Sequence, residues 1–270
     1  MRLALISDIH GNTFALDAVL ADARAMAVDE TWFLGDFSAI GPDPSGVLER
    51  VTSVDRARFL RGNTDRYTCT NDRPPPALAD VLGDPSQVDL YASISASFAW
   101  TRGFVSATGW FDWLAQLPLD IRETIDGMRL LAVHAAPGTD DGPGIHPGQG
   151  DAELSAMLDG CNADVVIVGH THEAMLRRLG ALTLVNLGSV SNPRSGDLRA
   201  SYVILEIARD GVFVQHRRVP YDHDAFSAQV RASHHPATEF ILAHQRGEML
   251  ARPRHPENVE PIPGIRVALR

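Results

Sequence analysis

The sequence has few cysteines and no long apolar runs. Cysteine accounts for 2 of its 270 residues, and Cys69 and Cys161 have no other soft ligand beside them. We therefore predict neither a disulfide framework nor a cysteine-based metal site. The apolar runs fall short of the roughly 20 residues that a membrane-spanning helix needs, and no charged-then-apolar leader opens the chain. We expect a cytoplasmic protein without a membrane partner.

Positive charge is also scarce. Lysine and arginine together number 24 against 34 aspartates and glutamates, which gives a net charge of −10 and a pI of about 5.5. This balance argues against a broad nucleic-acid surface. A small phosphate-bearing substrate stays possible, because bound cations supply positive charge locally. With 44% hydrophobic and 21% charged residues, the chain is typical of a globular protein with a sizeable core.

The first 61 residues alternate between strand and helix patterns. Apolar runs predict strands at about 3–7, 30–34 and 57–61. Between them, apolar spacing near 3.6 residues predicts helices at 13–23 and 45–54. An alternation of this kind predicts parallel strands joined by crossover helices, and hence an α/β fold.

The remainder departs from that rhythm. We predict a helical insertion over about 67–118 and a C-terminal helical tail over about 220–270, within a single domain spanning 1–270. Between these segments we expect a hairpin of strands 119–125 and 128–133, a short helix at 151–158 and a fully apolar strand at 164–168. Successive antiparallel strands are then predicted at 174–179, 182–187, 200–207 and 212–219. In the tail we predict helices at 224–232 and 236–246, and a poorly packed end from Ala251 onward.

Polar side chains follow five of the predicted strands directly. They are Asp8, His10, Asp36, Asn63, His134, His170 and His172. In open α/β sheets, ligands gather at the carboxyl ends of the strands. Seven nitrogen and oxygen ligands are too many for one tetrahedral zinc ion. They suit two divalent cations that share a carboxylate, an arrangement that clamps phosphoryl groups when the ions lie about 3.5–4 Å apart.

Taken in order, the motifs resemble those of the calcineurin-like metallophosphoesterases. The matching segments are Asp8-Ile9-His10, Gly35-Asp36, Gly62-Asn63-Thr64-Asp65, His134 and Gly169-His170-Thr171-His172. The resemblance extends from Met1 to about Val219, and the segment 186–190 is similar to the small YfcE-type phosphodiesterase branch. It implies a four-layer α/β/β/α sandwich of two mixed sheets flanked by helices, with a dimetal centre at the sheet edge.

The resemblance also implies a division of the ligands. One ion would be held by Asp8, His10, Asp36 and His172, and the other by Asp36, Asn63, His134 and His170, which makes Asp36 the bridge. The implied cofactor is a pair of Mn, Fe, Zn, Ni or Mg ions, whose bridging hydroxide attacks phosphorus. Asp36, Asn63, His134 and Asp65 would then take part in catalysis.

Residues beside the ligands suggest further roles. Asp65 would keep a ligand histidine in its tautomer by a hydrogen bond from outside the ligand set, with an exposed loop aspartate as the alternative. Many family members carry a histidine where this chain has Thr64. Without that imidazole a poor leaving group lacks a proton donor, so we do not expect efficient hydrolysis of simple alkyl phosphomonoesters. We list Asn63, Thr64, Ser189 and Arg194 as candidate substrate contacts; for Ser189 a plain tight turn, and for Arg194 a solvated loop residue, is the alternative.

The predicted function is metal-dependent hydrolysis of a phosphodiester or of a nucleotide-type phosphoester. Two alternatives stay open: a phosphomonoesterase or protein phosphatase using the same site, and a non-catalytic scaffold of the same fold. All seven motif positions carry side chains that bind metals, which favours an enzyme over a scaffold. The hairpin and the helical insertion also leave surface for a homo-oligomer.

Overall fold

A computed structural model describes residues 1–194, 196–209 and 211–249, together with the backbone of 265–268. Its strands are β1 Arg2–Ile6, β2 Glu30–Leu34, β3 Ala57–Leu60, β4 Asp120–Ile125, β5 Met128–Val133, β6 Val165–Val168, β7 Met175–Leu179, β8 Leu182–Asn186, β9 Ala200–Ala208, β10 Gly211–Val219 and β11 Ile265–Ala268. Its helices are α1 Thr13–Ala25, α2 Pro44–Thr52, α3 Asn63–Cys69, α4 Leu78–Gly83, the 3₁₀ turn η1 Pro85–Gln87, α5 Val88–Ala107, α6 Phe111–Ala115, α7 Asp151–Met157, α8 His223–Ala232 and α9 Thr238–Gln245.

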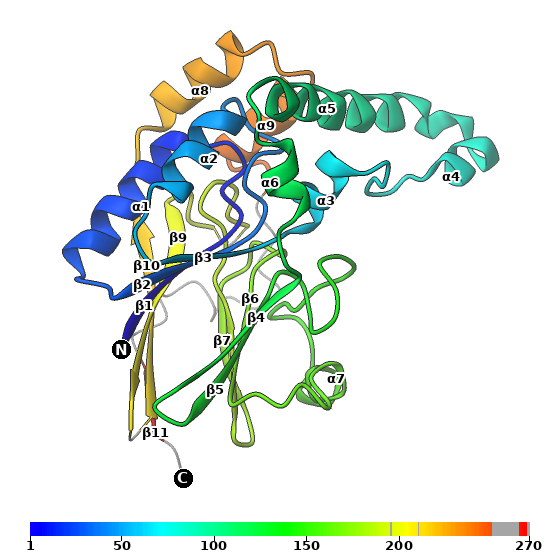
Figure 1. Cartoon of the computed structure of the whole chain (residues 1–270). Helices are drawn as coiled ribbons and strands as arrows, with labels where there is room; N and C mark the ends of the chain where they lie inside the picture. Colours follow the sequence, from blue (N-terminus) through cyan, green and yellow to red (C-terminus); the bar gives the residue numbers. More distant parts are fainter. Residues whose placement is uncertain (195, 210, 250–264, 269–270) are drawn as a thin grey trace.

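The described strands form two mixed sheets that pack face to face. One has the order β11-β10-β9-β1-β2-β3 and the other β4-β5-β6-β8-β7. The helices α1, α2 and α8 lie on the outer side of the first sheet, and α7 lies on the outer side of the second (Figure 1). The predicted four-layer α/β/β/α sandwich is therefore confirmed, with its fourth layer reduced to α7.

The alternating side chains of β1 explain how the layers meet. Leu3 and Leu5 point into the apolar cluster between the two sheets, which also contains residues of β5, β6 and β8. Ala4 and Ile6 point into the cluster beneath α1 and α2. Successive residues of a strand face opposite sides of a sheet, so a strand buried on both faces must be apolar throughout.

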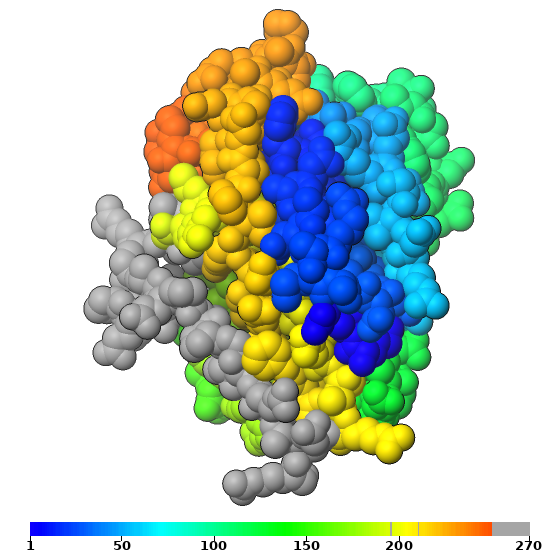
Figure 2. All heavy atoms as spheres, turned by 90° about the vertical axis from the view of Figure 1, so that its left-hand side faces the viewer, coloured from blue at the N-terminus to red at the C-terminus, as the bar shows by residue number. Residues whose placement is uncertain are grey.

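The helices that cover the first sheet begin at local capping residues. The side chain of Asn12 accepts a hydrogen bond from the backbone N–H of Ala15 at the start of α1, and Asp43 does the same for Gly46 in α2. These caps satisfy backbone donors that would otherwise lack a partner. Figure 2 shows α1 lying between α2 and α8 on this face.

Two expectations need correction. The predicted antiparallel succession breaks between β8 and β9. β7 pairs antiparallel with β8, and β9 with β10, as predicted, but β8 also pairs parallel with β6, whereas β9 lies in the other sheet and pairs with β1. The helical region also begins earlier than 67, since α3 starts at Asn63 itself. The predicted loose end from Ala251 lies outside the described residues, apart from the backbone of β11, which pairs with β10. No helix in the described chain is long and apolar enough to cross a bilayer.

Candidate metal centre

The seven predicted ligands meet at the carboxyl ends of five parallel strands from the two sheets. They follow β1, β2 and β3 in the first sheet, and β5 and β6 in the second. Short distances link all seven side chains in one chain of contacts: His172–Asp8 3.1 Å, His172–His10 3.2 Å, His10–Asp36 3.7 Å, Asp36–His134 3.5 Å, His134–Asn63 3.1 Å and Asn63–His170 3.1 Å.

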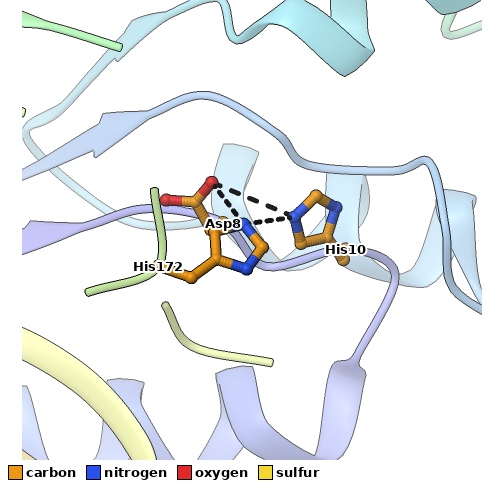
Figure 3. Close-up of side chains that lie close together, drawn as sticks. All are labelled: Asp8, His10 and His172. Atoms are coloured by element: carbon orange, nitrogen blue, oxygen red, sulfur yellow. Dashed lines mark hydrogen bonds and ion pairs between the residues drawn. The ribbon is translucent and has the colours of Figure 1, made fainter. Parts of the chain in front are cut away.

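Asp8, His10 and His172 form one half of this centre. Their side chains point toward one another from the β1 and β6 loops, as Figure 3 shows. Asp8 Oδ1 lies 3.1 Å from His172 Nε2 and 3.9 Å from His10 Nε2. Because their ligand atoms lie within 4.8 Å of one another, these residues can hold one metal ion.

Asp8, Asp36 and His134 form a second group of the same kind. Asp36 Oδ2 lies 3.5 Å from His134 Nε2 and 3.7 Å from His10 Nε2, whereas Asp8 Oδ1 lies 3.9 Å from both nitrogens. Each of the two carboxylates therefore lies within 4 Å of a histidine from both groups. The choice of Asp36 as the bridging ligand stays a prediction.

Backbone carbonyls orient all four histidine rings. Three rings contact a carbonyl through Nδ1: His10 with Ala39 at 3.0 Å, His134 with Leu34 at 2.6 Å and His172 with Asn192 at 2.8 Å. His170 is reversed, with Nε2 lying 2.9 Å from the carbonyl of Gly142. A carbonyl only accepts hydrogen bonds, so the nitrogen facing it carries the proton. In each neutral ring, the nitrogen that faces the centre is then a free lone pair.

The resulting set of atoms fits cations. Asn63 Oδ1 lies 3.1 Å from both His134 Nε2 and His170 Nδ1, so with neutral rings three acceptors face one another. Asp8 Oδ1 is buried and has no hydrogen-bond donor among the described residues. Unpaired buried acceptors are costly unless a proton or a cation lies between them.

The ionisation of the centre points the same way. Burial opposes a charged His134, but the carboxylates of Asp36 and Asp8 outweigh it and raise the pKa of His134 to about 10. Burial also opposes a charged Asp36, but the surrounding histidines hold its pKa well below the usual range. Buried carboxylates in this position attract positive charge, and divalent cations supply it.

Five of the seven candidate ligand residues adopt the left-handed backbone conformation. Their φ angles are 59° at Asp8, 47° at His10, 56° at Asp36, 66° at His170 and 60° at His172. This conformation costs roughly 1–2 kcal/mol for most residues other than glycine, although aspartate and histidine adopt it more often than most. Strain of this kind persists where surrounding packing imposes it, typically at functional sites.

Two glycines make room for the ligands. A Cβ atom on Gly62 would lie 2.0 Å from Asp36 Oδ1, and one on Gly169 would lie 2.6 Å from Asp8 Oδ2. Neither glycine has a positive φ. Gly62 is required by its close approach to the Asp36 carboxylate, and Gly169 by its close approach to the Ser7 hydroxyl and the Asp8 carboxylate, and neither by a sharp backbone turn.

With this geometry established, the chain can be compared with known proteins. Residues 1–210 match the model of the calcineurin-like phosphoesterase superfamily domain. The chain belongs to this superfamily. The prediction drawn from the strand-end motifs is thereby confirmed at the level of the family.

Several relatives support this assignment. An uncharacterized protein of Methanocaldococcus jannaschii is 28% identical over 222 residues, which cover 76% of this chain and 82% of that protein. The crystal structure of a metallophosphoesterase from Sphaerobacter thermophilus is 26% identical, with a TM-score of 0.71 over 92% of this chain and 99% of its own. The symmetrical bis(5′-nucleosyl)-tetraphosphatase of Pectobacterium carotovorum is 27% identical over 50% of this chain and 43% of that enzyme. The narrower YfcE-type branch stays a prediction.

Asp65 has a different role from the two that were considered. Its carboxylate accepts hydrogen bonds from the backbone N–H groups of Asp36 at 2.8 Å, Phe37 at 3.0 Å and Gly62 at 2.8 Å. It is only 1% exposed and orients no ligand histidine, because backbone carbonyls do that. Burial and the neighbouring Asp36 raise its pKa to about 7. Asp65 instead joins the β2 and β3 loops that present Asp36 and Asn63.

Ser189 also needs correction, since its side chain is fully buried. Its hydroxyl donates to the carbonyl of Asp8 at 2.9 Å and accepts from the N–H of Asn192 at 2.8 Å. It therefore positions the Asp8 loop and is not exposed to substrate. Thr64 is buried as well, and its backbone N–H donates to Asp36 Oδ1 at 2.9 Å.

Arg194 is the predicted substrate contact with the best access. It is exposed and lines a pocket of about 330 Å³ together with His170, His146 and Glu173. Its backbone N–H donates to the carbonyl of the ligand His172 at 3.1 Å. Arg194 thus lies at an opening beside the candidate ligands, whereas Ser189 is buried away from that opening.

The sequence patterns missed His244 on α9. The residue is 8% exposed, and its Nδ1 has no hydrogen-bond partner among the described residues. Burial lowers its pKa to about 3, and the nearby His172, His10 and Arg194 act in the same direction. Helix α9 of the predicted tail also reaches this region through Gln245, which donates to the carbonyl of Ser191 at 3.4 Å, next to the Asn192 carbonyl that orients His172. No local sequence pattern indicated this proximity.

Proposed function

We propose that this protein is a two-metal phosphoesterase acting on phosphodiesters or nucleotide-type phosphoesters. The observation that carries the proposal is the convergence of seven candidate ligand side chains, whose carboxylate, amide and imidazole atoms are directed at shared points, with Asp8 Oδ1 left without a hydrogen-bond partner among the described residues. One ion would be held by Asp8, His10, Asp36 and His172, and the other by Asp36, Asn63, His134 and His170. Two divalent cations bound there would lower the pKa of water and neutralise charge on a phosphoryl group.

The surrounding residues determine how a substrate would be received. Asn63 contributes a neutral carbonyl ligand, which limits the negative charge that faces an anionic ester. Arg194 at the neighbouring pocket can form a charge-assisted fork with phosphate oxygens. At position 64 the chain has threonine instead of an imidazole, so esters with good leaving groups are the expected substrates. The likeness to symmetrical bis(5′-nucleosyl)-tetraphosphatases supports nucleotide-type substrates.

A phosphoester panel tests this proposal. The purified protein is assayed with Mn, Fe, Zn, Ni or Mg against bis-p-nitrophenyl phosphate, p-nitrophenyl phosphate, cyclic nucleotides and dinucleotides. Asp36→Asn should abolish every activity and reduce metal binding, while Asp159→Asn, which removes the same charge at an exposed position, should not. We expect about two ions per chain and preferential cleavage of diesters.

The alternatives give different results. Faster hydrolysis of monoesters than of diesters would favour a phosphomonoesterase or protein phosphatase. Absence of bound metal and of activity would favour the non-catalytic scaffold. A single structural zinc ion would contradict the two-metal proposal.

A further inference from the structure

A cluster of charged residues joins the β3 and β5 loops next to the metal centre. Arg61 Nε and Arg66 Nε donate to the Asp140 carboxylate at 2.7 and 3.0 Å, and Arg66 Nη2 donates to Asp141 Oδ2 at 2.8 Å. The hydroxyl of Tyr67 donates to the same Asp141 oxygen. We call these five residues the Asp140–Asp141 clamp. Because the Asp140 side chain is 5% exposed and that of Arg66 19%, solvent screens the clamp less than an ordinary surface pair.

The clamp is attached to the backbone on both sides of the centre. Arg61 and Arg66 flank Asn63, and Asp140 and Asp141 follow His134 in the loop after β5. The clamp thus connects the segments that present two ligands assigned to the second ion. Neither Asp8 nor His10 hydrogen-bonds to it in the described chain.

The same loop contacts a third candidate ligand, His170. Asp141 Oδ1 accepts from the N–H of Gly142 at 2.7 Å, and the Gly142 carbonyl lies 2.9 Å from His170 Nε2. Two residues later, a Cβ atom on Gly144 would lie 2.7 Å from His170 Cδ2, so the loop backbone packs directly on the ring. His170 is also the ligand histidine that faces the centre with Nδ1, an orientation that depends on the position of this carbonyl.

We propose that the Asp140–Asp141 clamp is a positioning device for the second cation site: it aligns Asn63, His134 and His170 without holding the ligands that belong to the first ion alone. His172 and His10, which belong to the first ion, are oriented by the carbonyls of Asn192 and Ala39, outside the clamp. Loosening the clamp therefore weakens the binding of the second ion and leaves the binding of the first unchanged. This inference rests on the proposed two-metal function.

A matching cluster elsewhere in the chain provides the control. Tyr202 donates from its hydroxyl to Asp22 at 2.6 Å, and Arg217 donates to the same carboxylate at 2.7 and 2.8 Å. Tyr202 and Tyr67 are both buried, and each donates to an aspartate that an arginine also binds. In the described chain, none of the three control residues hydrogen-bonds to a predicted ligand or to a carbonyl that orients one.

The test is a Mn²⁺ titration of the metal-free full-length protein, with free Mn²⁺ followed by electron paramagnetic resonance. Wild type should bind two ions. Tyr67→Phe should bind one ion with wild-type affinity and the other about 10–100-fold more weakly, the usual loss when a group that orients a metal ligand is removed. Excess Mn²⁺ should restore its hydrolysis of bis-p-nitrophenyl phosphate. Tyr202→Phe should bind both ions as wild type does.

Two results would overturn the inference. Either Tyr67→Phe binds both ions normally, or it loses both equally while its melting temperature matches that of Tyr202→Phe. If Tyr67→Phe does not fold, Asp141→Asn serves in its place with the same expectations. A wild-type protein that binds fewer than two ions would instead overturn the two-metal function, and the inference with it.

Discussion

A methyl group on Gly62 would collide with the carboxylate that the two-metal proposal makes the bridge. In Gly62→Ala the new Cβ would lie 2.0 Å from Asp36 Oδ1 and 2.6 Å from the backbone nitrogen of Asp36. With φ at −97° and ψ at 176°, the backbone of Gly62 is in the extended region that alanine also adopts. The substitution therefore tests the position of Asp36 without adding strain to residue 62.

The expected magnitude follows from these distances. Real Cβ atoms essentially never come closer than 3.0 Å, so the carboxylate must move by about 3.0 − 2.0 = 1.0 Å. Its Oδ1 would also lose its present 2.9 Å hydrogen bond with the N–H of Thr64. A displacement of about 1 Å in a reactive site can cost 10²-fold in rate, which corresponds to about 2.7 kcal/mol of activation free energy.

The assay is kcat/KM for bis-p-nitrophenyl phosphate with Mn²⁺, together with the number of ions bound. We expect Gly62→Ala to lose at least about 100-fold in kcat/KM and to bind metal more weakly. Gly103→Ala is the control, because a Cβ atom there meets nothing within 4 Å and Gly103 lies inside α5; it should keep full activity and gain up to about 1 kcal/mol of stability. If Gly62→Ala kept wild-type activity and metal binding, the requirement for a close approach at Asp36 would be refuted.

Three further perturbations have defined outcomes. Thr64→His should raise the ratio of p-nitrophenyl phosphate to bis-p-nitrophenyl phosphate hydrolysis, because it adds a proton donor; an unchanged ratio contradicts the reasoning. Removing metal with a chelator should lower the melting temperature, and Mn²⁺ at 100 times its Kd should restore about 2.7 kcal/mol; calorimetry showing no shift would exclude bound cations. Burial lowers the pKa of His216 to about 4, so on acidification this histidine takes up a proton in the unfolded chain before it does so in the folded one. The free energy of unfolding should therefore fall between pH 6.5 and 4, by up to about 3 kcal/mol from this residue. In urea denaturation at pH 7 and pH 4.5, His216→Gln should show a smaller fall than wild type, and equal falls would show that His216 does not contribute.

The predictable part of the fold was the part that local patterns encode. Apolar runs and helical spacing located β1, α1, β2 and α2 to within a few residues. Strand partners were harder, because periodicity shows which face of a strand is apolar but does not name its neighbour. Hence β8 and β9 read as an antiparallel succession, although they belong to different sheets.

The candidate site divides in the same way. The convergence of the seven candidate ligands was predictable because each lies at the end of an apolar strand, and parallel strands bring their carboxyl ends to one edge. Their role as metal ligands stays a prediction. The roles of Asp65 and Ser189 were not, because both depend on which backbone groups lie nearby after folding. His244 approaches the centre from a helix more than 70 residues beyond the last ligand, so proximity in sequence could not indicate it.

By itself, the sequence indicated the fold class, the seven candidate metal-binding side chains and the family, since strand-end motifs combine residue type with strand position. Only the tertiary structure decided which histidine nitrogen faces the centre, which residues hold the loops, and that Gly62 and Gly169 are needed for close approach. The physical reason is that backbone carbonyls and N–H groups occur at almost every residue. Packing alone selects the few, such as the Gly142 carbonyl, that orient a ligand.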